Sequence, residues 1–95
     1  MSIEYRDKLR AIRLAEGLTQ KQFAELTGIS HSSIRNYEAK QAEVGLSILE
    51  RVMTCDLLHK YSLWLMTNQS APDANQIEPA AEYLEDGAKR KKKSA

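Results

Sequence analysis

The sequence predicts an all-α domain of five short helices, followed by a short extension and a basic tail. At 95 residues, the chain is long enough for a single hydrophobic core. Apolar residues recur three and four positions apart in five separate segments, which is the spacing of helices with one buried face. Glycine and small polar residues separate these segments at helix-cap positions. We expect a domain over 1–68, a dimerisation extension over 69–87 and a disordered tail over 88–95.

The first helix is expected over residues 2–16, because Tyr5, Leu9 and Ile12 follow helical spacing and Gly17 stands at a usual stopping position. The second helix, QKQFAELT, is expected to begin after the N-cap Thr19. Gly28 should end it. Its predicted buried residues are Phe23, Ala24 and Leu26.

The third helix, HSSIRNYEA, should follow the N-cap Ser30. Ile34 and Tyr37 stand three residues apart and are predicted to pack inward. The other side of this helix then remains free to contact a ligand. Its exposed polar residues are predicted to be His31, Ser32, Arg35 and Asn36.

Two further helices are predicted before the extension. One spans about Gly45–Thr54, and the other spans about Leu58–Thr67 and closes at Asn68. Spacing places Trp64 in the core rather than on a dimer surface. The predicted buried stripes are Leu46, Leu49 and Met53 in the former, and Tyr61, Trp64 and Leu65 in the latter.

Regular patterning stops after Asn68. QSAPDAN is typical of a turn, Pro79 excludes a central strand or helix interior, and AAEYLED is long enough for one more helical turn. A short strand around 76–78, paired across a two-fold axis, is one possible dimer contact.

Charge is distributed unevenly although the net charge is only +1. Residues 1–68 contain nine Lys/Arg and eight Asp/Glu, residues 69–88 contain five acids and no base, and 89–93 (KRKKK) contain five bases. Any DNA affinity of the domain must therefore come from a local basic face. The tail should be solvated and mobile, adding at most a salt-sensitive term that is blind to sequence.

Several function classes lack support in the sequence. No apolar run approaches the roughly 20 residues of a membrane span, and the charged N-terminus does not resemble an export signal, so we expect a cytoplasmic protein. Cys55 and His59 stand at no recognised zinc spacing. No Gly-rich phosphate loop or paired nucleophile and base is visible, so we expect no catalytic residue, cofactor, metal or small-molecule ligand.

The second and third helices have the requirements of a tight helix-turn-helix. Where two helices cross closely, the first helix needs a small residue and the turn needs a residue that tolerates a positive φ. Ala24 is that small residue, and Gly28 stands in the turn. Thr27 is the one imperfect position, because a larger apolar residue is usual there.

These residues, within LRAIRLAEGLTQKQFAELTGISHSSIRNYEAK, resemble the lambda-type (Cro/C1-type, XRE-like) family of helix-turn-helix repressors over about residues 6–68. The segment KYSLWLMTNQSAP and the following QIEPA are similar to the short C-type immunity repressors of temperate peduovirus-group coliphages. The resemblance implies the compact five-helix fold. It also implies a homodimer that binds a double-stranded DNA operator, and no autoproteolytic domain.

The resemblance also implies roles for individual residues. Gln20 corresponds to a phosphate-binding position, and Arg13 with Glu38 corresponds to a structural ion pair. His31 and Ser32 correspond to base-contacting positions. For His31, the alternative to a base contact is a purely structural role.

Given the resemblance, four further residues on and beyond the third helix have side chains suited to DNA contacts. Asn36 lies one turn further along it, and its amide suits adenine N6 and N7. Arg35 is a candidate for a contact to either a guanine or a phosphate. Lys40 and Gln41 are candidates for contacts to the DNA backbone.

The predicted function is a phage immunity repressor that occupies a lytic promoter as a homodimer. Two half-sites are needed because one recognition helix makes too few contacts for genomic specificity. The alternative is an antitoxin-like or adaptor module whose acidic segment binds a protein partner. An enzyme is the least supported class.

Overall fold

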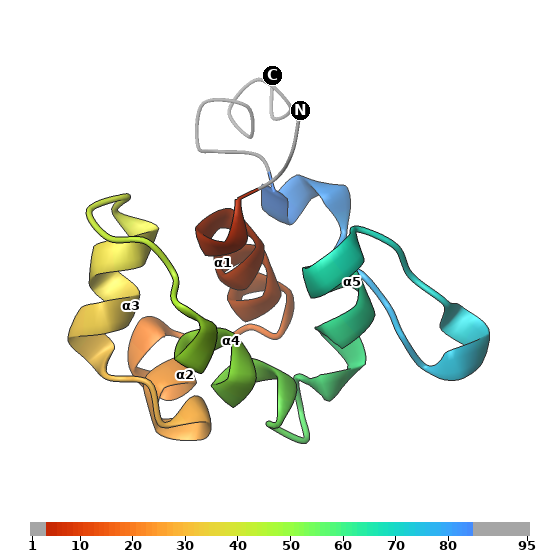
Figure 1. The fold of residues 1–95 in the computed structure, drawn as a ribbon, viewed down its shortest axis with the longest axis horizontal. Helices are drawn as coiled ribbons and strands as arrows, with labels where there is room; N and C mark the ends of the chain where they lie inside the picture. Colours follow the sequence, from red (N-terminus) through yellow and green to blue (C-terminus); the bar gives the residue numbers. More distant parts are fainter. Residues whose placement is uncertain (1–3, 85–95) are drawn as a thin grey trace.

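The computed structural model describes residues 4–84, which form five α-helices and three short 3₁₀ helices (Figure 1). The all-α class is confirmed, and these residues contain no strand. The tail predicted over 88–95 lies outside the described residues. The α-helices are α1 (Tyr5–Ala15), α2 (Gln20–Thr27), α3 (His31–Glu38), α4 (Leu46–Met53) and α5 (Ser62–Thr67). The 3₁₀ helices are η1 (His59–Tyr61), η2 (Pro72–Ala74) and η3 (Ala81–Leu84).

Helix α1 is central in the fold, with α2 and α3 on one side and α5 on the other (Figure 1). Leu9 and Ile12 are fully buried, as their spacing predicted, whereas Tyr5 is 37% exposed. Gly17 follows the helix with a φ of +72°, a conformation that glycine adopts without a Cβ penalty. The predicted residues 2 and 3 of this helix lie outside the described part of the chain.

Helix α2 has the predicted bounds and cap. The Thr19 hydroxyl accepts a 3.0 Å bond from the Gln22 N–H, and the Gln22 side chain accepts a 2.9 Å bond from the Thr19 N–H. This reciprocal capping box satisfies two donors at the helix start. The predicted burial of Leu26 is wrong, because it is 40% exposed. The buried row runs through Phe23 and Thr27 instead, and Leu26 lies beyond its edge.

Thr27 is buried although its hydroxyl is polar. Its Oγ1 donates to the Phe23 carbonyl at 2.8 Å and accepts from the Ile29 N–H at 3.2 Å. Burial of a hydroxyl costs little when both its donor and its acceptor roles are filled. Thr27, the one imperfect position of the predicted helix-turn-helix, therefore connects the end of α2 to the following turn.

Helix α4 packs through Leu49 and Val52. The prediction that Leu46 is buried is wrong, since this first helical residue is 67% exposed. Met53 is half-buried. The core therefore covers the second half of α4 and leaves its first turn in solvent.

The predicted fifth helix divides into η1 and α5 at Tyr61, whose ψ of 2° interrupts the α-helical geometry. Asn68 closes α5 in the left-handed conformation, as predicted, with a φ of 65°. Trp64 is a core residue, only 3% exposed.

Lys8 is buried on α1, at 3% exposure, and the sequence pattern did not predict this. Its ammonium donates to the carbonyls of Leu65 at 2.8 Å and Trp64 at 3.2 Å, and lies 5.3 Å from the centre of the Trp64 ring. Burial lowers the pKa of the Lys8 ammonium. Through these two carbonyls of α5, Lys8 joins α1 to α5.

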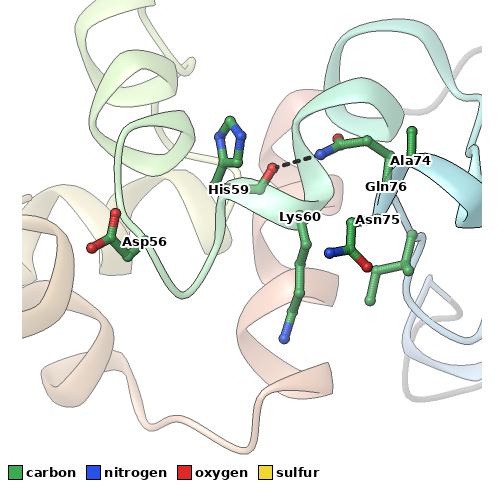
Figure 2. Close-up of a pocket in the computed structure, with 7 residues that line it drawn as sticks. Asp56, His59, Lys60, Ala74, Asn75 and Gln76 are labelled. Carbon is green, nitrogen blue, oxygen red and sulfur yellow. Dashed lines mark hydrogen bonds between the residues drawn. The ribbon is translucent and has the colours of Figure 1, made fainter.

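The extension folds back onto the domain. Ala71 and Gln76 form an isolated antiparallel bridge around η2. The Gln76 side chain accepts from the Leu63 N–H at 2.8 Å and donates to the His59 carbonyl at 3.3 Å (Figure 2). The Ile77 N–H donates to the Lys60 carbonyl at 2.8 Å. These bonds attach the loop to η1 and to the start of α5.

The helical turn predicted near residues 80–86 is present as η3, which packs beside α1 with half-buried Tyr83 and Leu84. Residues 76–78 form no strand within this single chain. A strand formed by pairing with a second copy stays a prediction.

Tyr37, near the end of α3, allows the packing of the core to be tested. Its side chain is 1% exposed, its hydroxyl has no hydrogen-bond partner among the described residues, and burial raises its pKa. Replacing Tyr37 with Phe should therefore leave the free energy of unfolding at pH 7 unchanged or raise it by about 1 kcal/mol. Urea unfolding followed by circular dichroism measures this, and a loss above about 1 kcal/mol would contradict it.

The same variant has an expected pH dependence. Unfolded tyrosine ionises near pH 10, whereas folded Tyr37 keeps its proton to higher pH. The unfolded state therefore binds fewer protons above pH 10, and wild-type stability should fall as the pH rises beyond that value. Tyr37→Phe should show a shallower fall.

Candidate nucleic-acid interface

The turn between α2 and α3 places these two helices in contact with each other. Gly28 has a φ of +81°, and its N–H donates to the Ala24 carbonyl at 2.9 Å. A Cβ at Gly28 would lie 3.0 Å from a guanidinium nitrogen of Arg51. Ala24 packs against the core as a half-buried small residue. Both residues therefore occupy the positions that the turn prediction required.

Helix α3 begins at the predicted cap. The Ser30 hydroxyl accepts from the Ser33 N–H at 3.1 Å and lies 2.8 Å from the Ser33 hydroxyl. Ile34 is fully buried and Tyr37 nearly so. These two anchors fix the rotation of the helix about its axis, so they determine which side chains face solvent.

The four predicted base-contacting residues occupy two adjacent rows on α3. Ser32 and Asn36 are exposed and stand one turn apart in one row. His31 and Arg35 form the other row, with His31 half-buried and Arg35 exposed. Successive helical residues are about 100° apart, so Arg35 and Asn36 point in different directions.

A half-buried network fixes both ends of the helix-turn-helix. The Arg13 guanidinium donates two 2.8 Å bonds to the Glu38 carboxylate and one 2.9 Å bond to the Leu18 carbonyl. The Arg13 and Glu38 side chains are only 11% and 6% exposed. The predicted ion pair is therefore present, and Arg13 balances the negative charge of Glu38 near the proposed DNA-binding face.

Gln20, the predicted phosphate contact, belongs to the same network. Its amide donates to Glu38 at 3.0 Å, which orients the first residue of α2 against the end of α3. No spacing or motif in the sequence indicated this bond. Because backbone N–H groups at a helix start lack intrahelical acceptors, Gln20 also presents a backbone donor there.

Lys40 and Gln41 follow α3 in a closing motif that the sequence pattern did not predict. Lys40 adopts a φ of +63°, its N–H donates to the Tyr37 carbonyl at 3.1 Å, and the Gln41 N–H donates to the Asn36 carbonyl at 2.8 Å. This is a Schellman motif with lysine in the place usually held by glycine. Both side chains are exposed, and Lys40 lies 3.4 Å from Asp7.

A hollow of about 510 Å³ adjoins this network between α1, the start of α2 and α3. The hollow is lined by Arg10, Arg13, Gln20, Arg35, Glu38 and Ala39. Arg10 was not among the residues predicted from the sequence. Its position one turn before Arg13 on α1 is the signal that identifies it in retrospect.

Other kinds of site find little support within residues 4–84. These residues contain no cluster of three or more His, Cys, Asp or Glu side chains suited to a metal ion. None of their helices has the length and apolar character needed to cross a membrane. Cys55 is a free, half-buried thiol that packs against the core.

Comparison with known proteins agrees with this geometry. A family model described as helix-turn-helix matches residues 9–54, which extend from the middle of α1 through α4. The chain is also similar to repressor protein C of Escherichia phage P2, with 34% identity over 84 residues. That match covers 88% of this chain and 85% of the phage protein, so it includes the extension as well as the helices.

Proposed function

The chain belongs to the helix-turn-helix family that includes repressor protein C of Escherichia phage P2, and we propose that it is itself a DNA-binding transcriptional repressor. The observation that carries this proposal is the exposed polar side of α3, held in a fixed orientation by Ile34 and Tyr37. A rigid helix with one free polar face suits insertion into the major groove of DNA. The proposed role is immunity repression in a bacterial cytoplasm, by occupation of a lytic promoter.

Base recognition is assigned first to the row of Ser32 and Asn36. An asparagine amide donates one hydrogen bond and accepts another, which matches N7 and N6 of adenine in the major groove. Ser32 accepts or donates with either kind of base edge. His31, at the start of the helix, borders this row and is assigned a base contact beside them.

Phosphate contacts are assigned to the two ends of the motif. Gln20 presents its backbone N–H at the start of α2, and Lys40 and Gln41 extend exposed side chains from the loop after α3. Such contacts set the register of the protein on DNA without reading its sequence.

A homodimer is proposed because one recognition helix makes too few base contacts for a unique genomic site. Residues 69–87 are the proposed dimer region. In support, Ile77 is 37% exposed at the predicted 76–78 contact although it is apolar.

Replacing Asn36 with alanine tests the base-reading face. Affinity for a duplex selected by the protein from a random pool should fall by about 1–3 kcal/mol, with relaxed preference at one base position. Transcription from a reporter promoter overlapping that site should recover. The side chain is exposed, so the free energy of unfolding should stay close to that of wild type.

Gln20→Ala is the matched comparison, and it should weaken binding similarly on all sequences. If Asn36→Ala left both affinity and base preference unchanged, Asn36 would not be a base-reading residue.

A further inference from the structure

We propose that Arg10 of α1 and Arg35 of α3 together bind one backbone phosphate of DNA in the hollow between them. Arg35 then positions the recognition helix and does not read a base. This inference rests on the proposed DNA-binding function and adds a second element, α1, to the DNA contact.

The charges that line the hollow leave these two arginines unbalanced. Both Glu38 oxygens accept bonds from Arg13, and one also accepts from Gln20, so this carboxylate is already engaged. No acidic side chain in residues 4–84 forms an ion pair with Arg10 or Arg35. The hollow therefore presents two guanidinium groups, from two different helices, that form no ion pair with the residues of 4–84.

Guanidinium groups suit a phosphate because their planar fork of N–H donors matches two phosphate oxygens at once. Gln20, assigned to a phosphate on separate grounds, lines the same hollow. Three residues of the kind that contact the DNA backbone thus line the same hollow. Reading a guanine requires only one guanidinium, whereas this hollow is lined by two besides that of Arg13. A phosphate is therefore the better match for the hollow.

The position of Arg35 on α3 supports the same assignment. It stands three residues before Glu38 and four before Ala39, so it shares the side of the helix that faces α1 and the start of α2. Asn36 lies about 100° away around the helix axis. When Ser32 and Asn36 enter the major groove, Arg35 faces the strand backbone that forms the wall of the groove.

Arg10 also borders a smaller hollow of about 210 Å³ with Leu14, Glu82 and Tyr83. A purely structural role, in which the arginine stem supports η3 against α1, is therefore the competing explanation. That role predicts a loss of stability without any change in the salt dependence of DNA binding.

The test measures affinity for two duplexes between about 50 and 200 mM salt. One duplex carries the site that wild type selects from a random pool, and the other has the same base composition in scrambled order. Arg10→Ala and Arg35→Ala should each weaken binding to both duplexes by about tenfold. The double variant should reduce the slope of log affinity against log salt by about 0.9, the value for one phosphate, and each single variant should reduce it by part of that amount.

Two further variants sharpen the comparison. Arg10→Lys should retain the wild-type salt slope, because it keeps the charge but loses the planar fork. Arg51→Ala is the matched control, since it removes an exposed arginine from the last turn of α4, outside the hollow. It should leave affinity and slope unchanged.

Two results would overturn the inference. In one, Arg35→Ala weakens only the selected duplex and changes preference at one base. In the other, Arg10→Ala keeps the wild-type slope while its melting temperature falls. If wild type bound both duplexes equally, the proposed sequence-specific function would fail, and the phosphate site would still be measured on the scrambled duplex.

Discussion

Replacing Arg13 with alanine is expected to lower the free energy of unfolding by about 3–5 kcal/mol. The change leaves the Glu38 carboxylate, now only 6% exposed, with Gln20 as its remaining side-chain donor. It also removes the donor to the Leu18 carbonyl, which holds the turn between α1 and α2. Small domains are stable by only about 5–15 kcal/mol, so a substantial unfolded fraction is expected at 37 °C. Urea denaturation followed by circular dichroism measures the loss.

A double variant separates the ion pair from the volume that it fills. Arg13→Met with Glu38→Leu removes both charges and keeps much of the packing, so it should be more stable than Arg13→Ala alone. If Arg13→Ala lost less than about 1 kcal/mol, the pair would behave as an exposed surface pair and this account of it would be wrong.

Lys8→Glu is expected to have an effect of similar size at the other side of α1. It places a carboxylate in a site of 3% exposure, opposite two carbonyl oxygens that now accept from an ammonium. The desolvation penalty for a buried ion is several kcal/mol, and here no donor compensates for it. The negative end of the α5 dipole adds further repulsion. Thermal unfolding should show a fall of more than about 10 °C in the melting temperature.

Lys8→Met is the matched control for this site. Methionine keeps the apolar stem against Trp64 and removes only the ammonium, so its loss should be close to that of a charged hydrogen bond, about 1.5–3 kcal/mol. Equal stability of Lys8→Glu and Lys8→Met would show that the side chain at position 8 turns out to solvent. Lys8 would then not connect α1 to α5.

Local chemistry explains which features of the fold could be predicted. Thr19 and Ser30 cap their helices through bonds within three residues along the chain, and Gly28 and Asn68 take left-handed conformations that their own residue types favour. Such preferences act before any tertiary contact forms. They therefore gave the bounds of α2, the start of α3 and the end of α5.

Burial at the edges of helices could not be predicted in the same way. Leu26 and Leu46 continue apolar spacing but lie beyond the area that neighbouring elements cover. Lys8 is the opposite case, because its burial depends on the end of α5, 56 residues further along the chain. Periodicity within one helix contains no information about which neighbours meet it.

In the candidate site, too, some features could be predicted from the sequence and others depend on tertiary packing. The resemblance to known repressors implied the Arg13–Glu38 pair, and the structure contains it. The bond from Gln20 to Glu38 and the place of Arg10 beside Arg35 arise from the packing of α1 against the helix-turn-helix. The spacing of residues along the sequence does not indicate that α1 packs against the helix-turn-helix in this way.

Selection of bound DNA from a random pool by the full chain tests whether the protein is a sequence-specific, dimeric repressor. We expect enrichment of one short sequence that recurs as two half-sites at fixed spacing, because a dimer presents two copies of α3. Recovery of unenriched DNA, with affinity that depends on salt and not on sequence, would contradict this expectation.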